Sequence, residues 1–398
     1  MTTPTTAQTS PRTTVPTESV VPFRIDLPQA LAADVRERLA RTRWPELETV
    51  GDWSQGTRLD FVRELCRYWQ EEYDWAAAEA RLNRFPQFTT GIDGLDIHFT
   101  HVRSPHPQAV PLLITHGWPG SVVEFHKVIG PLVDPVAHGG DPADAFHVVC
   151  PSLPGFGFSG KPDRPGWGTE RIADAWDQLM NRLGYRRYGA QGGDWGARIT
   201  MELGRRHPDR LIGIHLTMVP FEPPRDPGLL ADLTDREHAA LERLDRHRAQ
   251  GSAYAAIQAT RPQSIGYGLT DSPAALAGWL LEKFAEWSDC DGDPASVFGT
   301  EELLDNLLMY WVPGTGASAA RLYWESFGAL GGRPAPIRVP TGCSVFPADY
   351  YRPTRRLAEP GYPALRYWNE LDAGGHFPAL EQPELLVAEA RAAFRAFR

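Results

Sequence analysis

The sequence is poor in cysteine. Its 398 residues include four, at positions 66, 150, 290 and 343, and none forms a CxxC pair. This spacing excludes a dense disulfide framework and a cysteine-based zinc site, and it suits the reducing cytoplasm. The 12 histidines show no metal-ligand spacing, and no HExxH or Walker motif occurs. We therefore expect neither a metal nor a cofactor.

Long apolar runs and excess positive charge are also missing. No stretch approaches the roughly 18 consecutive apolar residues of a membrane helix, and the first residues lack a signal-peptide pattern, so no membrane partner is expected. Lys and Arg number 40 against 50 Asp and Glu, which gives a net charge of −10. Phosphate backbones attract basic surfaces, so nucleic acid is not an expected partner either.

The remaining composition is that of a folded globular protein, with 42% hydrophobic and 23% charged residues. Residues 1–20 are rich in Thr and Pro, which predicts a disordered lead. Helical periodicity with several Trp follows over 21–90. Strands alternate with helices over 91–218 and 335–398, which predicts two parts of one largely parallel α/β sheet. Helical patterns without strands predict an inserted cap over 219–334.

The strands expected in this sheet are short apolar or β-branched runs that end at Gly and Pro. They are Ile97–Val102, Leu112–Thr115, Phe146–Leu153, Tyr188–Gly192, Leu211–Leu216, Gly342–Phe346 and Ala364–Tyr367. The helices expected outside the sheet are Pro28–Trp44, Leu59–Trp69 and Trp75–Leu82 before it, Arg236–Gln250, Pro273–Trp287 and Glu301–Trp311 in the cap, and Glu384–Phe397 at the end.

The segment QGGDWGA, which contains Asp194, follows a predicted strand and opens a helix. It has the form of a nucleophile elbow, in which small residues flank a reactive side chain on a strained strand-to-helix turn. Asp194 holds the position usual for Ser, and the Trp195 N–H directly after it can face the reacting carboxylate. The alternative is a Gly-rich turn in which Asp194 only caps a helix.

The segment HGWPGS, His116–Ser121, directly follows another predicted strand. A loop at this place can supply a second oxyanion donor, here the Trp118 N–H. We expect His116 and Pro119 to orient substrate or the loop, with His116 not acting as a base. The alternative is an ordinary turn that ends a strand.

The segment AGGHFPALEQPE places His376 in a loop between the last strand and the final helix. Histidine titrates near neutral pH, so it is a natural general base. Asp349, in FPADY after a different strand, could orient its imidazole. The chain order Asp194, Asp349, His376 matches the nucleophile, acid and His order of the α/β-hydrolase template.

These segments together resemble an epoxide hydrolase of the α/β-hydrolase superfamily, in the branch with the microsomal-type and fungal soluble enzymes. Residues Pro22–Pro45 and Arg81–Phe99 resemble the N-terminal domain of that branch, and HGWPGS, GGDWGA and GGHFPALEQPELL resemble its core motifs. The resemblance covers nearly the whole chain. It implies the α/β-hydrolase fold, in which a mostly parallel sheet is flanked by helices, with a helical cap and a helical N-terminal extension.

The resemblance also implies the roles of individual residues. Asp194 would be the nucleophile, His376 the base and Asp349 its acid partner, where some relatives have Glu. The N–H groups of Trp118 and Trp195 would hold the oxyanion.

Two cap tyrosines would complete the site. They match Tyr254, in SAYAAIQATRPQSIG, and Tyr323, in ASAARLYWE, with Tyr310 as a nearby alternative to Tyr323.

The implied reaction adds water to a small-molecule epoxide, hydrophobic or aryl, through an Asp194 ester to give a vicinal diol. Two other functions stay open. A haloalkane dehalogenase also uses Asp followed by Trp, and a non-catalytic ligand-binding protein can have the hydrolase fold. The natural substrate, its role in detoxification or biosynthesis, and association into a homodimer are left open by these motifs.

Overall fold

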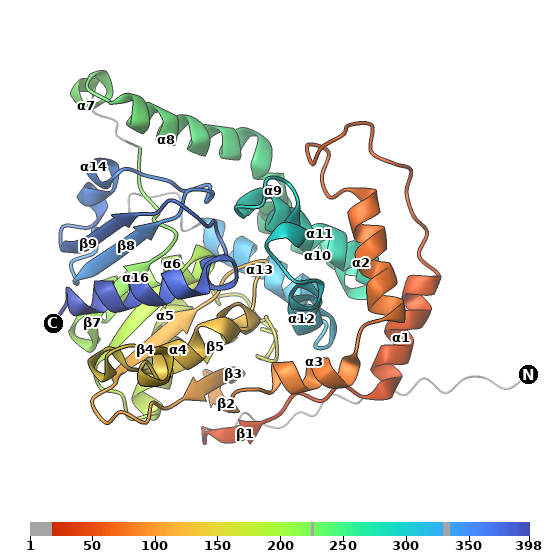
Figure 1. The fold of residues 1–398 in the computed structure, drawn as a ribbon, viewed down its shortest axis with the longest axis horizontal. Coiled ribbons are helices and arrows are strands. Elements are labelled where there is room, and N and C mark those ends of the chain that lie inside the picture. Colours follow the sequence, from red (N-terminus) through yellow and green to blue (C-terminus); the bar gives the residue numbers. More distant parts are fainter. Residues whose placement is uncertain (1–17, 224–226, 329–334) are drawn as a thin grey trace, which may run out of the picture.

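The computed structural model describes residues 18–223, 227–328 and 335–398. Of the disordered lead predicted for residues 1–20, residues 1–17 lie outside the described residues. A nine-stranded sheet forms the centre of the molecule, in the order β1-β2-β3-β5-β4-β6-β7-β8-β9 (Figure 1). Its strands are β1 Val21–Phe23, β2 Gln87–Ile92, β3 Leu95–Val102, β4 Val110–Thr115, β5 Phe146–Pro151, β6 Tyr188–Gly192, β7 Leu211–Leu216, β8 Thr341–Val345 and β9 Leu365–Glu370.

The sheet is mostly parallel, which confirms the predicted fold class. Strands β5, β4, β6, β7, β8 and β9 pair in parallel, whereas β1, β2 and β3 form an antiparallel edge against β5. The central strands β4, β6, β7 and β8 are almost entirely buried because helices cover both faces.

The segment 21–90, predicted to be helical, also contributes β1 and most of β2 to the sheet. The hairpin between β2 and β3 turns at Asp93 and Gly94, which both have positive φ, 51° and 78°. An Asp-Gly pair between two strands is typical of such a turn, so a signal for β2 was present. Strand β1 has only three residues, too few for a pattern to show. The division of the chain into folding units stays a prediction.

The helices lie on both faces of the sheet and in the cap. Before the sheet core come α1 Gln29–Ala40, α2 Leu59–Glu71 and α3 Trp75–Leu82. The core helices are α4 Ile129–Val133, α5 Thr169–Arg182, α6 Asp194–Arg206, α14 Arg355–Ala358, α15 Pro378–Glu381 and α16 Pro383–Arg395. The cap has α7 Pro227–Ala231, α8 Asp235–Arg246, α9 Ala253–Thr260, α10 Pro262–Asp271, α11 Pro273–Trp287, α12 Thr300–Trp311 and α13 Gly316–Phe327.

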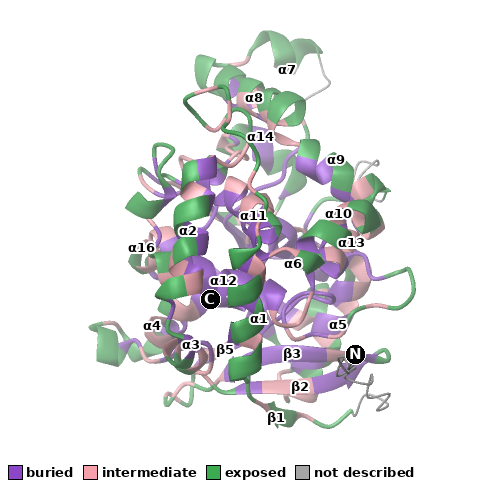
Figure 2. Cartoon of the chain, turned by 90° about the vertical axis from the view of Figure 1, so that its right-hand side faces the viewer, coloured by how far each residue is buried: buried purple, intermediate pink, exposed green. Residues whose placement is uncertain are grey.

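The N-terminal helices pack against the cap, with α1 and α2 against α11 and α3 against α12 (Figure 1). On this side of the molecule α1 and α2 expose their outer faces (Figure 2). Arg38 Nη1 donates to the Asp271 carbonyl at 2.7 Å, and Arg81 Nε donates to the largely buried Asp305 carboxylate at 2.7 Å. These bonds tie α1 to α10 and α3 to α12. The segment 21–90 therefore supports the cap from outside.

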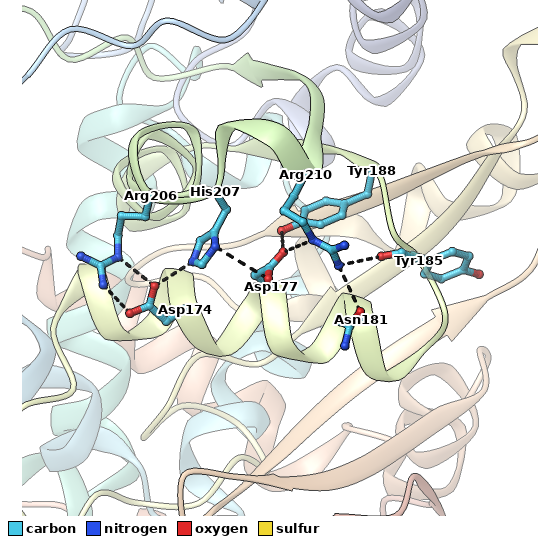
Figure 3. A network of polar contacts seen from close by, with 8 residues as sticks. All are labelled: Asp174, Asp177, Asn181, Tyr185, Tyr188, Arg206, His207 and Arg210. Carbon is cyan, nitrogen blue, oxygen red and sulfur yellow. Dashed lines mark hydrogen bonds and ion pairs between the residues drawn. The ribbon is translucent and has the colours of Figure 1, made fainter.

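A network of charged side chains joins α5 to the C-terminal end of α6 (Figure 3). Asp174 accepts hydrogen bonds from Arg206 Nε and His207 Nε2, both at 2.8 Å. Asp177 accepts one from Arg210 Nε at 2.9 Å. A single exposed ion pair stabilises a protein little, but several partners here fix the direction in which the chain leaves α6 and enters β7.

The fold contains a buried neutral histidine, His98 on β3. Its Nδ1 lies 2.9 Å from Ser152 Oγ and its Nε2 lies 2.8 Å from Gln87 Oε1. Burial lowers the pKa of His98 to about 3. Above the unfolded-state pKa of about 6.5 both states are neutral, and below it only the unfolded state gains a proton, so acid favours unfolding.

We therefore expect His98→Asn to be less stable than the parent at pH 8 but less sensitive to acid. Between pH 6.5 and 4.5 the parent should lose up to about 1.4 kcal/mol more unfolding free energy per pH unit than the variant. Urea unfolding at several pH values measures both slopes. Equal slopes would show that His98 is protonated in the folded state.

Candidate active site

Asp194 lies at the strained turn between β6 and α6. Its φ is 47°, in the left-handed region that L-residues rarely adopt. The N-cap of α6 is Gly193, so Asp194 is not the helix cap that the alternative interpretation required. A Cβ at Gly196 would lie 1.9 Å from the Thr115 carbonyl oxygen, and one at Gly192 would lie 2.3 Å from the Gly196 backbone. Only glycines let the strand and helix approach this closely, as a nucleophile elbow requires.

The two carboxylate oxygens of Asp194 face different partners. Oδ1 accepts a hydrogen bond from the Trp118 N–H at 2.9 Å. Oδ2 lies 3.5 Å from His376 Nε2 and 3.4 Å from the Tyr350 hydroxyl. Among the described residues, the Trp195 amide makes no hydrogen bond to this carboxylate, although it follows Asp194 directly. One oxygen is thus held by the backbone and the other faces an ionisable ring.

His376 and Asp349 form a buried pair behind the carboxylate. His376 Nδ1 lies 3.2 Å from Asp349 Oδ1, and the His376 N–H donates to the Trp287 carbonyl at 2.9 Å. Burial lowers the pKa of His376, but the Asp349 and Asp194 carboxylates outweigh it and raise the pKa to about 10. The imidazolium form is therefore stabilised between two negative charges. Asp194, Asp349 and His376, predicted from three distant segments, come together.

Two cap tyrosines lie over the loop that holds Asp194. The Tyr254 ring, from α9, stacks on Trp118 with 4.9 Å between ring centroids. The Tyr323 ring, from α13, meets Trp195 edge-on at 4.8 Å and Tyr254 at 5.8 Å. Burial raises the pKa of both hydroxyls well above the usual value, so both stay protonated donors.

Tyr310, the alternative to Tyr323, is engaged elsewhere. Its hydroxyl donates to the Gly120 carbonyl at 2.7 Å, and its ring contacts Phe156. Tyr310 thus holds the loop that follows Trp118, whereas Tyr323 contacts Tyr254. The structure groups Tyr323 with the site.

His116 and Pro119 hold the same loop in place. His116 Nδ1 lies 2.9 Å from the Gly117 carbonyl, and its Nε2 accepts the Leu153 N–H at 3.2 Å. Burial lowers the pKa of His116 to about 4, so the ring is neutral with both nitrogens occupied. The Pro119 carbonyl accepts from Asn306 on α12 at 2.9 Å. Both residues orient the loop, and His116 is not placed to act as a base.

Comparison with known proteins identifies the family. Residues 20–125 match the family described as epoxide hydrolase N terminus, and residues 110–251 match the alpha/beta hydrolase fold family. A protein of Stigmatella aurantiaca that carries an epoxide hydrolase name is 51% identical over 381 residues, which cover 95% of this chain and 86% of that protein. The chain belongs to the epoxide hydrolases. It is thus a hydrolase that acts on small-molecule epoxides.

Relatives from animals and fungi agree with this family. Epoxide hydrolase 1 of Oryctolagus cuniculus is 34% identical to this epoxide hydrolase, with 94% of this chain and 88% of the relative covered. The crystal structure of the juvenile hormone epoxide hydrolase of Bombyx mori superimposes with a TM-score of 0.88 at 31% identity, covering 96% of each chain. The Aspergillus niger epoxide hydrolase gives a TM-score of 0.86 at 32% identity and covers 96% and 98% of the two chains.

Within residues 18–223, 227–328 and 335–398, no group of three or more His, Cys, Asp or Glu side chains is arranged to hold a metal ion. None of the helices in those ranges is long and apolar enough to cross a membrane.

Three residues near the site were not predicted from the sequence. Tyr350 lies between His376 and His247, with ring centroids 5.2 Å and 4.1 Å away. Trp287 packs edge-on against His376 at 4.8 Å. Glu124 lines a cavity that Asp194 also lines. No motif marks these positions, although Tyr350 directly follows Asp349 and Glu124 follows the HGWPGS loop.

Proposed function

We propose that this epoxide hydrolase opens its substrate in two steps, through a covalent ester between Asp194 and one carbon of the epoxide. The observation that carries the proposal is the division of the Asp194 carboxylate. Oδ1 is held by the Trp118 N–H at 2.9 Å, and we assign the attack to Oδ2, which lies 3.4 Å from the Tyr350 hydroxyl and 3.5 Å from His376 Nε2. An ionised carboxylate needs no prior deprotonation, so it can attack an in-line ring carbon directly.

In the first step Oδ2 forms a bond to a ring carbon and the carbon–oxygen bond of the epoxide breaks. The oxygen leaves as an alkoxide and takes a proton from Tyr254 or Tyr323, whose hydroxyls are protonated because burial raises their pKa. An alkoxide requires such a donor, whereas a halide leaves as a stable anion. The tyrosine pair therefore fits an epoxide better than an alkyl halide.

The second step consumes water. Once Asp194 is an ester it carries no charge, so the interaction that helps raise the pKa of His376 is lost. The imidazolium proton can then return to the tyrosinate, which leaves His376 neutral. Water attacks the Asp194 carbonyl carbon and gives its proton to His376, and the N–H groups of Trp118 and Trp195 stabilise the oxyanion. Collapse breaks the ester bond and expels an alkoxide, which takes the proton of the new Asp194 carboxyl group. The vicinal diol leaves, Asp194 is again a carboxylate and His376 is again an imidazolium.

The substrate class we propose is a hydrophobic or aryl epoxide. Four aromatic rings gather over Asp194, and an aromatic surface favours apolar substrates. They belong to Trp118, Trp195, Tyr254 and Tyr323.

A single-turnover reaction in heavy-oxygen water tests the ester. With enzyme in excess over substrate, the first diol should contain only light oxygen, because the added oxygen comes from Asp194. The heavy oxygen should instead appear in the peptide that contains Asp194, as mass spectrometry of a digest would reveal. Heavy oxygen in the first diol would mean that water attacks the epoxide directly, and the covalent mechanism would be wrong.

A further inference from the structure

A small cavity lies beside the Asp194 carboxylate, with a volume of about 20 Å³. A space of roughly 10 to 15 Å³ or more can hold one water when polar groups surround it. The polar side chains in the wall include Asp194, His376 and Glu124. Tyr254 and Tyr323 are not part of the wall, so the cavity does not reach the cap tyrosines. It has the size and polarity for a single water.

Glu124 is the carboxylic acid in this wall that the proposed mechanism does not use; Thr115 and Gln191, whose side-chain oxygens have no hydrogen-bond partner within the described part of the chain, line the cavity as well. It lies on the short 3₁₀ helix η1, Val122–Lys127, and is buried. Among the described residues, no side chain donates a hydrogen bond to it or pairs with it, and the backbone amide of Ser121 faces it. Burial raises the pKa of Glu124 to about 8, with His376 opposing and Asp194 adding to the rise. A buried carboxyl with free hydrogen-bonding capacity costs stability unless something fills that capacity.

The HGWPGS loop makes room for this carboxyl. A Cβ at Gly120 would lie 1.2 Å from Glu124 Oε1. Any side chain at position 120 would therefore displace the Glu124 carboxyl from its place. The missing side chain at Gly120 thus allows the Glu124 carboxyl group, four residues later, to line the cavity.

The geometry points to a specific role: Glu124 positions the water that hydrolyses the Asp194 ester. The water gives one proton to His376 while the water oxygen attacks the Asp194 carbonyl carbon. The second hydrogen of the water bonds to the C=O oxygen of the Glu124 side-chain carboxyl group. This oxygen accepts whether the acid is neutral or ionised, so no proton is gained or lost by Glu124. Because the step exists only if Asp194 forms an ester, the role rests on the function proposed above.

Rapid-quench mass spectrometry of the intact enzyme with styrene oxide as the probe tests this role, since it follows formation and loss of the Asp194 ester separately. In Glu124→Leu we expect ester hydrolysis to slow about tenfold, because the water loses one hydrogen bond. Ester formation should stay within about twofold of the parent rate. Glu124→Gln keeps an acceptor oxygen and should hydrolyse the ester close to the parent rate. Gly120→Ala, which displaces the carboxyl, should resemble Glu124→Leu and serves if that variant does not fold.

The matched control is Glu381→Gln. Glu381 is another acid whose pKa burial raises, to about 7, but its oxygens accept the Phe377 and Asp289 N–H groups at 2.8 Å and it does not line the cavity. It should lower stability without separating the two rates.

The role is wrong if Glu124→Leu slows both steps equally or neither, or if Glu124→Gln is as slow as Glu124→Leu. The role is also wrong if Gly120→Ala slows ester formation and ester hydrolysis by the same factor, or slows neither. A reference reaction separates this failure from that of the covalent mechanism. If His376→Gln collects no ester under the same conditions, the proposed function itself fails.

Discussion

Asp194→Asn should abolish epoxide opening while the protein stays folded. The amide has nearly the shape of the carboxylate and can still accept the Trp118 N–H, which donates to Oδ1 at 2.9 Å. It lacks the negative charge that attacks carbon, so we expect turnover to fall by a factor on the order of 10⁴ or more, as for removal of other enzymatic nucleophiles. Steady-state diol formation and thermal unfolding of the same preparation measure both effects.

The control for this substitution is a buried aspartate remote from the site. Asp144 forms an ion pair with Arg395 of α16, so Asp144→Asn should lower the melting temperature but keep turnover. If the Asp194 variant retained more than a small fraction of the parent activity, with mass spectrometry showing that Asn had not reverted to Asp, another group would be the nucleophile.

His376→Gln should open epoxide once and then stop as the Asp194 ester. The substitution keeps the nucleophile Asp194 but removes the base for the attacking water. General-base assistance contributes about 10² to 10⁴ in rate, so ester hydrolysis should slow by that factor. The intact mass should rise by the mass of the substrate. If no ester collects although substrate is bound, either His376 is not the hydrolytic base or Asp194 is not the nucleophile.

The cap tyrosines should give the opposite result. With Tyr254→Phe and Tyr323→Phe combined, the alkoxide loses both proton donors, so opening becomes slow and no ester accumulates. Tyr310→Phe is the matched control, because that hydroxyl donates to the Gly120 carbonyl at 2.7 Å and not to the site. If Tyr310→Phe slowed ester formation as much as Tyr323→Phe, the second proton donor would be Tyr310.

The core of the fold was predictable because its strands are short apolar runs in a strict alternation with helices. Strands β6 and β7 begin and end at the predicted residues. The prediction was weaker at the N-terminal edge, where β1 has three residues and pairs with β2 across more than 60 positions of sequence. Such a strand exists because its partner offers an edge to pair with, and local propensity does not reveal that partner.

The sequence alone was sufficient to predict the residues of the nucleophile elbow, the HGWPGS loop after β4 and the family. The backbone conformation at Gly192, Asp194 and Gly196 depends on the local sequence, so a short motif predicts it. The tertiary structure alone decided which other side chains meet there. Tyr310 and Tyr323 are both cap aromatics on neighbouring helices, and only the packing of α12 and α13 turns one toward Gly120 and the other toward Tyr254. Glu124 and Tyr350 became visible for the same reason, because burial and distance to Asp194 depend on contacts between segments far apart in the chain.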